Sequence, residues 1–352
     1  MEFSDSAEHR ALRQAVGAIA ADFGGGYFAR KAEAREPTTE LWDALGAHGY
    51  IGINVPEAYG GGGAGLAELT IVCEETAAQG CPLLLLLVSS AIAGEVIAAY
   101  GTEEQRKLYL PRLASGEGKI AFAITEPEGG SNTHRLATTA TRDRDGYLLS
   151  GQKYYISGVD EADAILVVAR TGVDETTGHA ELSLFLVDTD APGLVQQPLP
   201  VSVTLPERQF TLFFDDVRVG ADRLVGSAGA GFAQVFHGLN PERITGAAVC
   251  VGIGRYALKQ ASEYASNRVV WDRPIGAHQG VSHALAKAKI EVELAALMTA
   301  RAAWLHDNGE PAGEAANMAK YAAAEAALAA VDAAIQCHGG NGLATEYGLL
   351  PL

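Results

Sequence analysis

Two short segments of this chain combine hydroxyls, glycines and aromatic rings at a spacing that suits a flat, phosphate-bearing ligand. Residues 121–131 form an apolar run that breaks into a glycine turn, with Thr125 before the turn and Ser131 after it. In such a turn, backbone N–H groups and hydroxyls converge on a phosphate or on a ring edge. Residues 154–157 end a second apolar run with Tyr155 and Ser157, which could line a heteroaromatic ring. Taken alone, each segment is equally compatible with an ordinary turn or strand end.

Two later segments carry further groups that suit a phosphate. Arg268 supplies a planar guanidinium fork, which pairs well with pyrophosphate. Residues 336–342 read Gln-Cys-His-Gly-Gly-Asn-Gly, and paired glycines allow a close backbone approach. Gly339 and Gly340 could also simply end a helix.

Glu242 is the candidate general base, and it has a structural alternative. It follows Asn240 and Pro241 and precedes Arg243. Asn is a good N-cap, Pro suits the first helical position, and an acidic residue is stabilised in the first turn. A helix start and Arg243 would lower the pKa of Glu242, whereas burial would raise it, and the sequence leaves open which effect dominates.

Composition excludes several function classes. The formal net charge of −17 over 352 residues argues against nucleic acid, so any phosphate on a substrate must meet a local basic patch. The four cysteines show no CxxC pair and no metal-site spacing, which favours reduced packing residues in a cytoplasmic protein. Residues 1–5 are acidic where a signal peptide would be basic. The apolar run 82–93 is shorter than the roughly 18–20 residues that span a bilayer, so we expect a buried helix and no membrane insertion.

Hydrophobic periodicity predicts an α+β multidomain protein in the order helix, sheet, helix. Residues 1–118 show helical spacing, with a capping box at Thr102 and Gln105. Residues 119–226 contain short β-type runs at 164–169, 181–188 and 210–214, which indicate a β-domain. Residues 227–352 predict a helical bundle, with a hairpin formed by 281–306 and 314–337.

Two glycine patterns resemble nucleotide motifs without the required context. Residues 252–257 fit Gly-x-Gly-x-x-Ala, but no strand precedes them and one helical face continues through them, so helix packing is the better interpretation. Residues 60–65 are glycine-rich, but no Gly-Lys-Ser/Thr follows. A surface turn is expected there.

Taken together and in this order, the segments resemble the acyl-CoA dehydrogenase family. The resemblance covers nearly the whole chain and includes residues 55–61, 101–105, 109–113, 121–131, 154–157, 214–219, 267–275 and 336–342. It implies dehydrogenation of an acyl-CoA or acyl-carrier thioester to the 2,3-enoyl thioester, in fatty acid or amino acid catabolism. An electron-transfer flavoprotein is the implied electron acceptor, and no metal is implied.

The resemblance also implies FAD as the cofactor. The positions that match its contacts are Phe122, Ile124, Thr125, Gly130, Ser131, Tyr155, Ile156, Ser157, Arg268, Trp271, Gln279, Gln336, Gly339 and Gly340. Thr125 is expected to bond the flavin, and Ser131 with the neighbouring amides to hold the pyrophosphate. Ser157 is expected to bond flavin N5, with Ile156 pointing to the other face of the strand. Arg268, Gln279 and residues 336–340 are implied to reach a neighbouring subunit's FAD, which predicts a homodimer or homotetramer.

For the substrate, the matching positions are Ser131, Arg243, Leu87 and Ser90, and the implied base is Glu242. One branch of the family, which includes isovaleryl-CoA dehydrogenases, carries its base in this helix. The commoner base position lies downstream of Leu352, where we expect that residues of the natural protein are missing. Asn132 replaces the usual aspartate and Asp272 the usual glycine, so the resemblance leaves the local charge and turn at these positions open.

Two other functions stay open at this point. The same fold could serve a flavin oxidase or monooxygenase, in which reduced flavin meets oxygen. It could also serve as a non-catalytic subunit of a heteromeric dehydrogenase. The leucines at 83–87 hint at a short or branched acyl group, but the acyl chain length is not readable from the sequence.

Overall fold

The computed structural model describes residues 5–349 of the chain. Residues 1–4 and 350–352 lie outside the described residues, and with them most of the acidic start and the chain end discussed above. The described residues divide into two compact units, each assembled from segments that are distant in sequence. The helical unit takes its described residues from Met1–Ala34, Ala64–Leu83 and Asn240–Leu352, and the sheet unit consists of Arg35–Gly63 and Leu84–Leu239.

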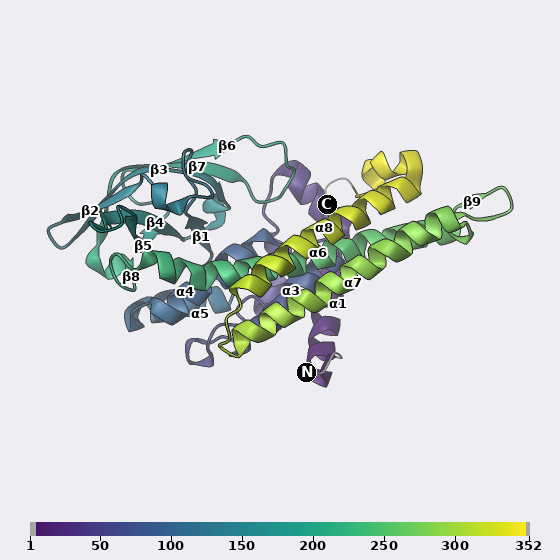
Figure 1. Cartoon of the computed structure of the whole chain (residues 1–352), viewed down its shortest axis with the longest axis horizontal. Helices are drawn as coiled ribbons and strands as arrows, with labels where there is room; N and C mark the ends of the chain where they lie inside the picture. The colour runs from purple at the N-terminus through teal and green to yellow at the C-terminus, as the bar shows by residue number, and fades with distance from the viewer. Residues whose placement is uncertain (1–4, 350–352) are drawn as a thin grey trace. The chain divides into compact units, whose positions relative to one another are not determined.

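Long helices form the helical unit. They are α1 (Ala7–Ala34), α3 (Leu66–Ala78), α6 (Gly231–Asn267), α7 (Gln279–Asp307) and α8 (Gly313–His338), and α6 begins in the sheet unit. Its short elements are β9 (Val269–Val270), β10 (Arg273–Pro274), η6 (Ile275–Ala277), η7 (Gly339–Leu343) and η8 (Thr345–Tyr347). The expected helical hairpin is confirmed, because α7 and α8 lie side by side over most of their length (Figure 1).

Small residues let the helices of this unit approach one another closely. A Cβ added to Gly252 of α6 would lie 2.3 Å from the carbonyl oxygen of Glu74 on α3. One added to Gly254 would lie 2.7 Å from Val292 on α7. On α8, every buried residue except His338 is an alanine. The Gly-x-Gly-x-x-Ala pattern therefore lies inside a helix and serves helix packing, as expected.

Polar contacts fix the ends and the centre of this bundle. The Asp307 carboxylate, at the end of α7, accepts hydrogen bonds from the N–H groups of Leu66 and Ala67 at 2.7 and 2.9 Å, and so caps α3. Glu74 is buried on α3 and pairs with Arg13 of α1 and Arg255 of α6. Burial raises the pKa of Glu74, and the two arginines offset only part of that effect.

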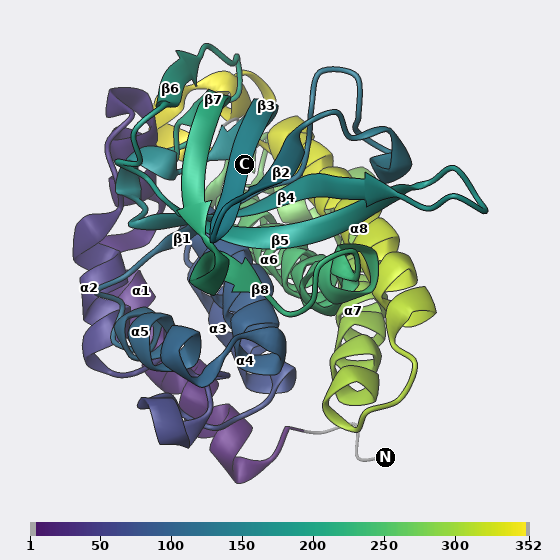
Figure 2. The same ribbon diagram turned by 90° about the vertical axis from the view of Figure 1, so that its left-hand side faces the viewer.

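The sheet unit combines short helices with one eight-stranded sheet. Its helices are α2 (Thr39–Ala47), α4 (Glu95–Tyr100), α5 (Glu103–Ala114) and the π-helix η2 (Leu86–Gly94), and its 3-10 turns are Glu57–Tyr59, Thr133–Arg135, Val159–Glu161 and Ala221–Arg223. The strands are β1 (Ile120–Ala123), β2 (Thr139–Asp143), β3 (Gly146–Ser157), β4 (Ala164–Val173), β5 (Ala180–Asp188), β6 (Leu194–Leu199), β7 (Gln209–Gly220) and β8 (Leu224–Val225). They pair in the order β6-β7-β3-β2-β4-β5-β8, with β1 parallel to β4 (Figure 2).

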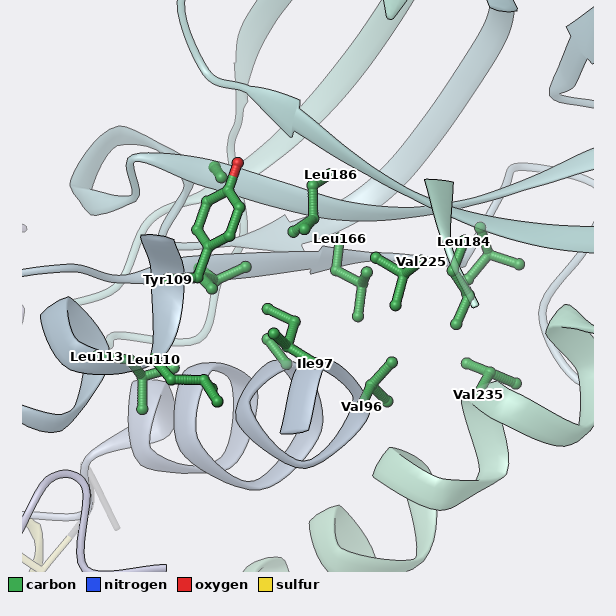
Figure 3. Close-up of a cluster of buried hydrophobic side chains, with 14 of the residues drawn as sticks. Val96, Ile97, Tyr109, Leu110, Leu113, Leu166, Leu184, Leu186, Val225 and Val235 are labelled. Atoms are coloured by element: carbon green, nitrogen blue, oxygen red, sulfur yellow. The ribbon is translucent and has the colours of Figure 1, made fainter. Parts of the chain in front are cut away.

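Alternate residues of the central strand β4 enter two separate cores. Leu166 and Val168 pack with α4, α5 and the other side chains shown in Figure 3. Ile165 and Val167 belong to the second cluster, which includes Phe185 of β5. Both faces of β4 are buried over residues 164–169, and this part of the strand is a continuous apolar run. The helix, sheet, helix order predicted from periodicity is confirmed.

Several local expectations are confirmed and one is wrong. Thr102 and Gln105 form the expected capping box at α5, and the apolar run around η2 is a buried helix. The structural alternative for Glu242, a helix that starts at Asn240, is the one that is wrong, because α6 begins at Gly231 and Pro241 lies inside it. The N-cap signal was misleading because the apolar side chains before it, such as Val235, already pack in the core and extend the helix backwards. No helix among residues 5–349 is both long and apolar enough to cross a membrane.

The close approach of α6 and α3 yields a stability test. Gly252→Ala should destabilise the protein by about 1–3 kcal/mol, because the added methyl group collides with backbone that has no room to move. Gly280→Ala in α7 is the matched control, since no atom lies within 4 Å of its added Cβ. Urea unfolding should show a lower midpoint for the first variant and an unchanged or higher one for the second. Equal midpoints would contradict the packing role of Gly252.

Candidate active site

The glycine turn follows β1 and presents an open tip. Glu126 and Gly129 exchange two backbone hydrogen bonds, at 3.0 and 3.1 Å, which close the turn. Beyond it Gly130 and Ser131 are exposed, and no atom lies within 4 Å of a Cβ added to Gly130. Thr125 is half-buried just before the turn. Hydroxyls and backbone amides are therefore accessible here to a ligand.

A buried ion pair holds this turn against β3. The fully buried Lys153 donates hydrogen bonds to the Ile124 carbonyl at 3.0 Å and to Glu126 Oε1 at 2.8 Å. The Glu126 carboxylate also accepts the N–H groups of Ala137 at 2.5 Å and Thr138 at 3.0 Å. Burial works against its ionisation, but Lys153 and these donors hold the pKa of Glu126 below its ordinary value. Burial lowers the pKa of Lys153 to about 8, against the attraction of Glu126.

The strand that carries Lys153 then bulges. The register of β3 on β7 shifts between Lys153 and Ile156, and Tyr155 has a φ of 58°, which is uncommon for a side chain of its size. Tyr155 is 54% exposed, whereas Ile156 is only 2% exposed and belongs to a core. The expected opposite orientation of these two residues is found, although the bulge produces it together with strand alternation. The Tyr154 N–H donates to the Thr125 carbonyl at 2.8 Å and joins the bulge to the glycine turn.

Ser157 ends β3 directly opposite Gln209 of β7. Its hydroxyl donates a hydrogen bond to Gln209 Oε1 at 3.0 Å. Both side chains are half-buried. Thr125, Tyr155 and Ser157 thus come from adjoining backbone segments of the sheet unit.

In the helical unit, a hairpin presents Arg268 and Trp271. Strands β9 and β10 pair around the tip residues Trp271 and Asp272, and Trp271 is 87% exposed with a φ of 60°. Arg268 is exposed at the base, where its carbonyl accepts the Ile275 N–H at 2.8 Å. Gln279 is the exposed first residue of α7. The guanidinium of Arg268, the indole of Trp271 and the amide of Gln279 are therefore exposed and available to a ligand.

Tyr264 connects this hairpin to the second glycine turn. The N–H of Arg268 donates to its carbonyl at 2.8 Å, and its ring stacks on His338 at 4.1 Å between centroids. The helix-stop interpretation holds, because α8 ends at His338 and Gly339 follows with a φ of 60° and a ψ of −135°. No atom lies within 4 Å of a Cβ added to Gly339 or Gly340, and Gln336 before them is exposed. The backbone at Gly339 and Gly340 is therefore also open to a ligand.

Glu242 lies within α6 and is half-buried. Burial raises its pKa, while Lys320 and Arg243 work in the opposite direction without cancelling the effect. The question left open by the sequence is therefore answered in favour of burial. Arg243 donates a hydrogen bond to Asn240 Oδ1 at 3.2 Å. A carboxylate with a raised pKa is better matched to proton abstraction near neutral pH than an ordinary glutamate.

The residues proposed for the acyl group are largely buried in the sheet unit. Ser90 has no exposed surface, and its hydroxyl donates to the Ile51 carbonyl at 2.8 Å. Leu87 is 8% exposed. Phe122 and Ile124 are half-buried and pack against the cluster of Figure 3. Any contact of the Ser90 hydroxyl with a ligand would have to coexist with its bond to Ile51.

Family comparisons agree with this arrangement. Three models match the chain: the N-terminal domain of acyl-CoA dehydrogenases at residues 6–117, the middle domain at 121–217 and the C-terminal domain at 229–351. The chain belongs to the acyl-CoA dehydrogenase family. It is 54% identical to acyl-CoA dehydrogenase FadE12 of Mycobacterium tuberculosis over 349 residues, which are 99% of this chain and 90% of that protein.

Solved structures of this fold extend the comparison. A glutaryl-coenzyme A dehydrogenase in complex with glutaryl-CoA superimposes with a TM-score of 0.94 at 31% identity, over 100% of this chain and 90% of that one. PigA with FAD and proline superimposes with a TM-score of 0.93 at 26% identity, over 100% and 92%. The present acyl-CoA dehydrogenase is thus an oxidoreductase that acts on acyl-CoA, and its cofactor is FAD. The open glycine turns, the accessible hydroxyls and the exposed Arg268 and Trp271 fit such a cofactor.

Sequence reasoning missed the residues that support this site. It did not single out Lys153 or Tyr264, and it gave Glu126 no role. The strand pattern carried a signal for Lys153. Because side chains alternate along a strand, Lys153 lies on the same face of β3 as the fully buried Leu149. A lysine at an inward position requires a buried anion nearby. Tyr264 gave no comparable signal, since its partners come from the far end of α8.

Removal of Lys153 should be strongly destabilising. Lys153→Met leaves the Glu126 carboxylate buried without its cation, which costs about 3–5 kcal/mol in comparable pairs. Urea unfolding should show this loss, and the purified variant should retain less FAD because the glycine turn loses its anchor. Lys287→Met is the control, because its side chain is 79% exposed in a surface pair and should change stability by less than about 0.5 kcal/mol. A variant as stable as the wild type would contradict the anchoring role.

Proposed function

We propose that this acyl-CoA dehydrogenase converts an acyl-CoA, or a thioester on an acyl carrier, to the 2,3-enoyl thioester with Glu242 as the base. The observation that carries the proposal is the raised pKa of a half-buried carboxylate in α6. The Glu242 carboxylate takes the proton from the α-carbon. FAD, when bound, would supply the acceptor for the hydride from the β-carbon. The C–H bonds at both carbons break, and the new double bond forms between them.

We assign the cofactor contacts to both units. In the sheet unit, Thr125, Ser157 and the amides around Gly130 and Ser131 would hold the flavin and the pyrophosphate, and Tyr155 would stand beside the ring. In the helical unit, Arg268, Trp271, Gln279 and residues 336–340 would bind FAD of a neighbouring subunit. The exposed Arg268 and the open backbone at Gly339 and Gly340 support this assignment. As substrate contacts we assign Ser131, Leu87 and Ser90 from the sheet unit and Arg243 from the helical unit.

The proposed assembly is a homodimer or homotetramer. The helical unit exposes large apolar side chains along its hairpin, namely Ile290, Leu294, Leu297 and Trp304 on α7 and Tyr321 and Leu328 on α8. The exposure of so many large apolar side chains on one hairpin supports self-association through it. The four cysteines are free, which supports a reducing compartment such as the cytoplasm. The electron acceptor we propose, from the family alone, is an electron-transfer flavoprotein.

The base assignment is tested by Glu242→Gln. The amide keeps the shape of the side chain but does not accept a proton, so flavin bleaching by a bound acyl-CoA should slow by about 100-fold or more while binding survives. The measurement is an anaerobic titration with a panel of acyl thioesters, followed by stopped-flow absorbance. In the wild type, the bleaching rate should rise with pH through the raised pKa of Glu242, because only the ionised carboxylate accepts the proton.

Glu263→Gln is the matched control for that titration. Glu263 is an exposed glutamate on the same helix, so its amide variant should bleach at the wild-type rate. If Glu242→Gln bleaches within a few-fold of wild type, the base is another residue. A wild-type protein that binds the thioesters without bleaching would favour a non-catalytic subunit, and rapid reoxidation by oxygen would favour an oxidase.

Arg268→Ala tests the cofactor contact across subunits. Charge-assisted bonds to phosphate are worth roughly 1.5–3 kcal/mol, so the dissociation constant of FAD should rise by at least about tenfold. Arg301→Ala is the control, since this exposed arginine lies on α7 outside the assigned contacts. Sedimentation of the same samples should give a dimer or tetramer. A monomer saturated with FAD would rule out the shared site.

A further inference from the structure

The pair formed by Ser157 and Gln209 has a defined hydrogen-bond direction. The Ser157 hydroxyl is the donor and Gln209 Oε1 is the acceptor, at 3.0 Å. The two residues are directly opposite each other on β3 and β7, and Gln209 also pairs with Leu199 of β6 on its other side. The backbone of Gln209 is therefore held between two strands.

The residues around Gln209 hold this end of β7 in place. The Gly158 N–H donates to the Arg208 carbonyl at 2.9 Å, and Arg208 Nε donates to Asp160 at 2.7 Å. Glu207 is buried, and its carboxylate accepts the Leu84 N–H at 3.2 Å. These contacts hold the residues that precede Gln209, and with them the end of β7 that lies opposite Ser157.

This direction determines what the serine oxygen offers to a ligand. A serine hydroxyl has one hydrogen to donate and two lone pairs to accept with. Because its hydrogen is directed to Gln209, the oxygen presents only lone pairs on its remaining side. Oxidised flavin has an unprotonated N5, which is an acceptor, whereas reduced flavin carries a hydrogen at N5 and is a donor. The oriented oxygen therefore complements the reduced form.

We propose that Gln209 is a positioning residue that turns Ser157 into an acceptor for the N–H of reduced flavin and so favours hydride transfer from the substrate. The hydride brings one hydrogen and an electron pair from the β-carbon to N5, and the α-proton goes to the Glu242 carboxylate. This inference rests on the proposed function, in which Ser157 is the residue at N5. The role that it gives to Gln209 is to orient the Ser157 hydroxyl.

The test is the reduction potential of the holoenzyme. Gln209→Leu removes the acceptor and frees the hydroxyl to donate to oxidised N5. The reduction equilibrium should then shift about tenfold towards oxidised flavin, which is about 30 mV for a two-electron couple. Potentials are measured anaerobically against a reference dye, with the dissociation constant of FAD determined in parallel. Gln209→Met is a second variant without an acceptor oxygen, in case leucine disturbs the strand.

Two further variants separate this role from a structural one. Ser157→Ala removes the oriented hydroxyl, so adding Gln209→Leu to it should shift the potential no further. Gln197→Leu, an exposed glutamine on β6, should leave the potential unchanged. If Gln209→Leu and Gln209→Met keep the wild-type potential, or if Gln209→Leu shifts it equally with and without Ser157, the inference is wrong. A wild-type protein that takes up no FAD would overturn the proposed function and this inference together.

Discussion

The sheet-unit half of the proposed site depends on one buried ion pair. Lys153 and Glu126 have both been removed from water, a cost that is recovered only when geometry and additional hydrogen bonds are good. Here the lysine also bonds the Ile124 carbonyl, and the carboxylate also accepts two backbone N–H groups. The pair therefore joins the end of β1, the glycine turn and the strand that bulges at Tyr155. Every cofactor contact assigned to the sheet unit lies on a segment that this pair holds in place.

The helical unit is held together mainly by close helix packing. Its helices carry alanine and glycine at their contacts, so backbones approach closely and dispersion contacts accumulate without large side chains. Charged groups are then placed where the helices end or cross, as Asp307 caps α3 and Glu74 links α1 to α6. This close packing fixes α6, and with it the position of Glu242 along a helix that does not begin where its sequence suggests.

The position of Glu242, the proposed base, inside a helix has a physical consequence for its pKa. At a helix start, the N-terminal dipole would have kept Glu242 ionised and weakly basic. Within α6, the backbone N–H groups are already paired, so burial controls the pKa and raises it against Lys320 and Arg243. The same side chain is thus a better proton acceptor because the helix begins earlier, at Gly231. Local helix geometry and proposed chemistry are connected at this residue.

The sequence by itself determined the helix, sheet, helix order, the hairpin of α7 and α8, the capping box at Thr102 and the family. These depend on periodicity and on short motifs, which are local properties of the chain. The start of α6 could not be predicted, because packing of Val235 and its neighbours overrides the N-cap signal at Asn240. The partners of Lys153, Tyr264 and Ser157 were also unreadable, since each contact joins residues far apart in sequence through a bulge, a ring stack or a strand register. Only the tertiary structure decided those contacts, because burial and hydrogen-bond direction are set by what surrounds a side chain and not by its neighbours in the chain.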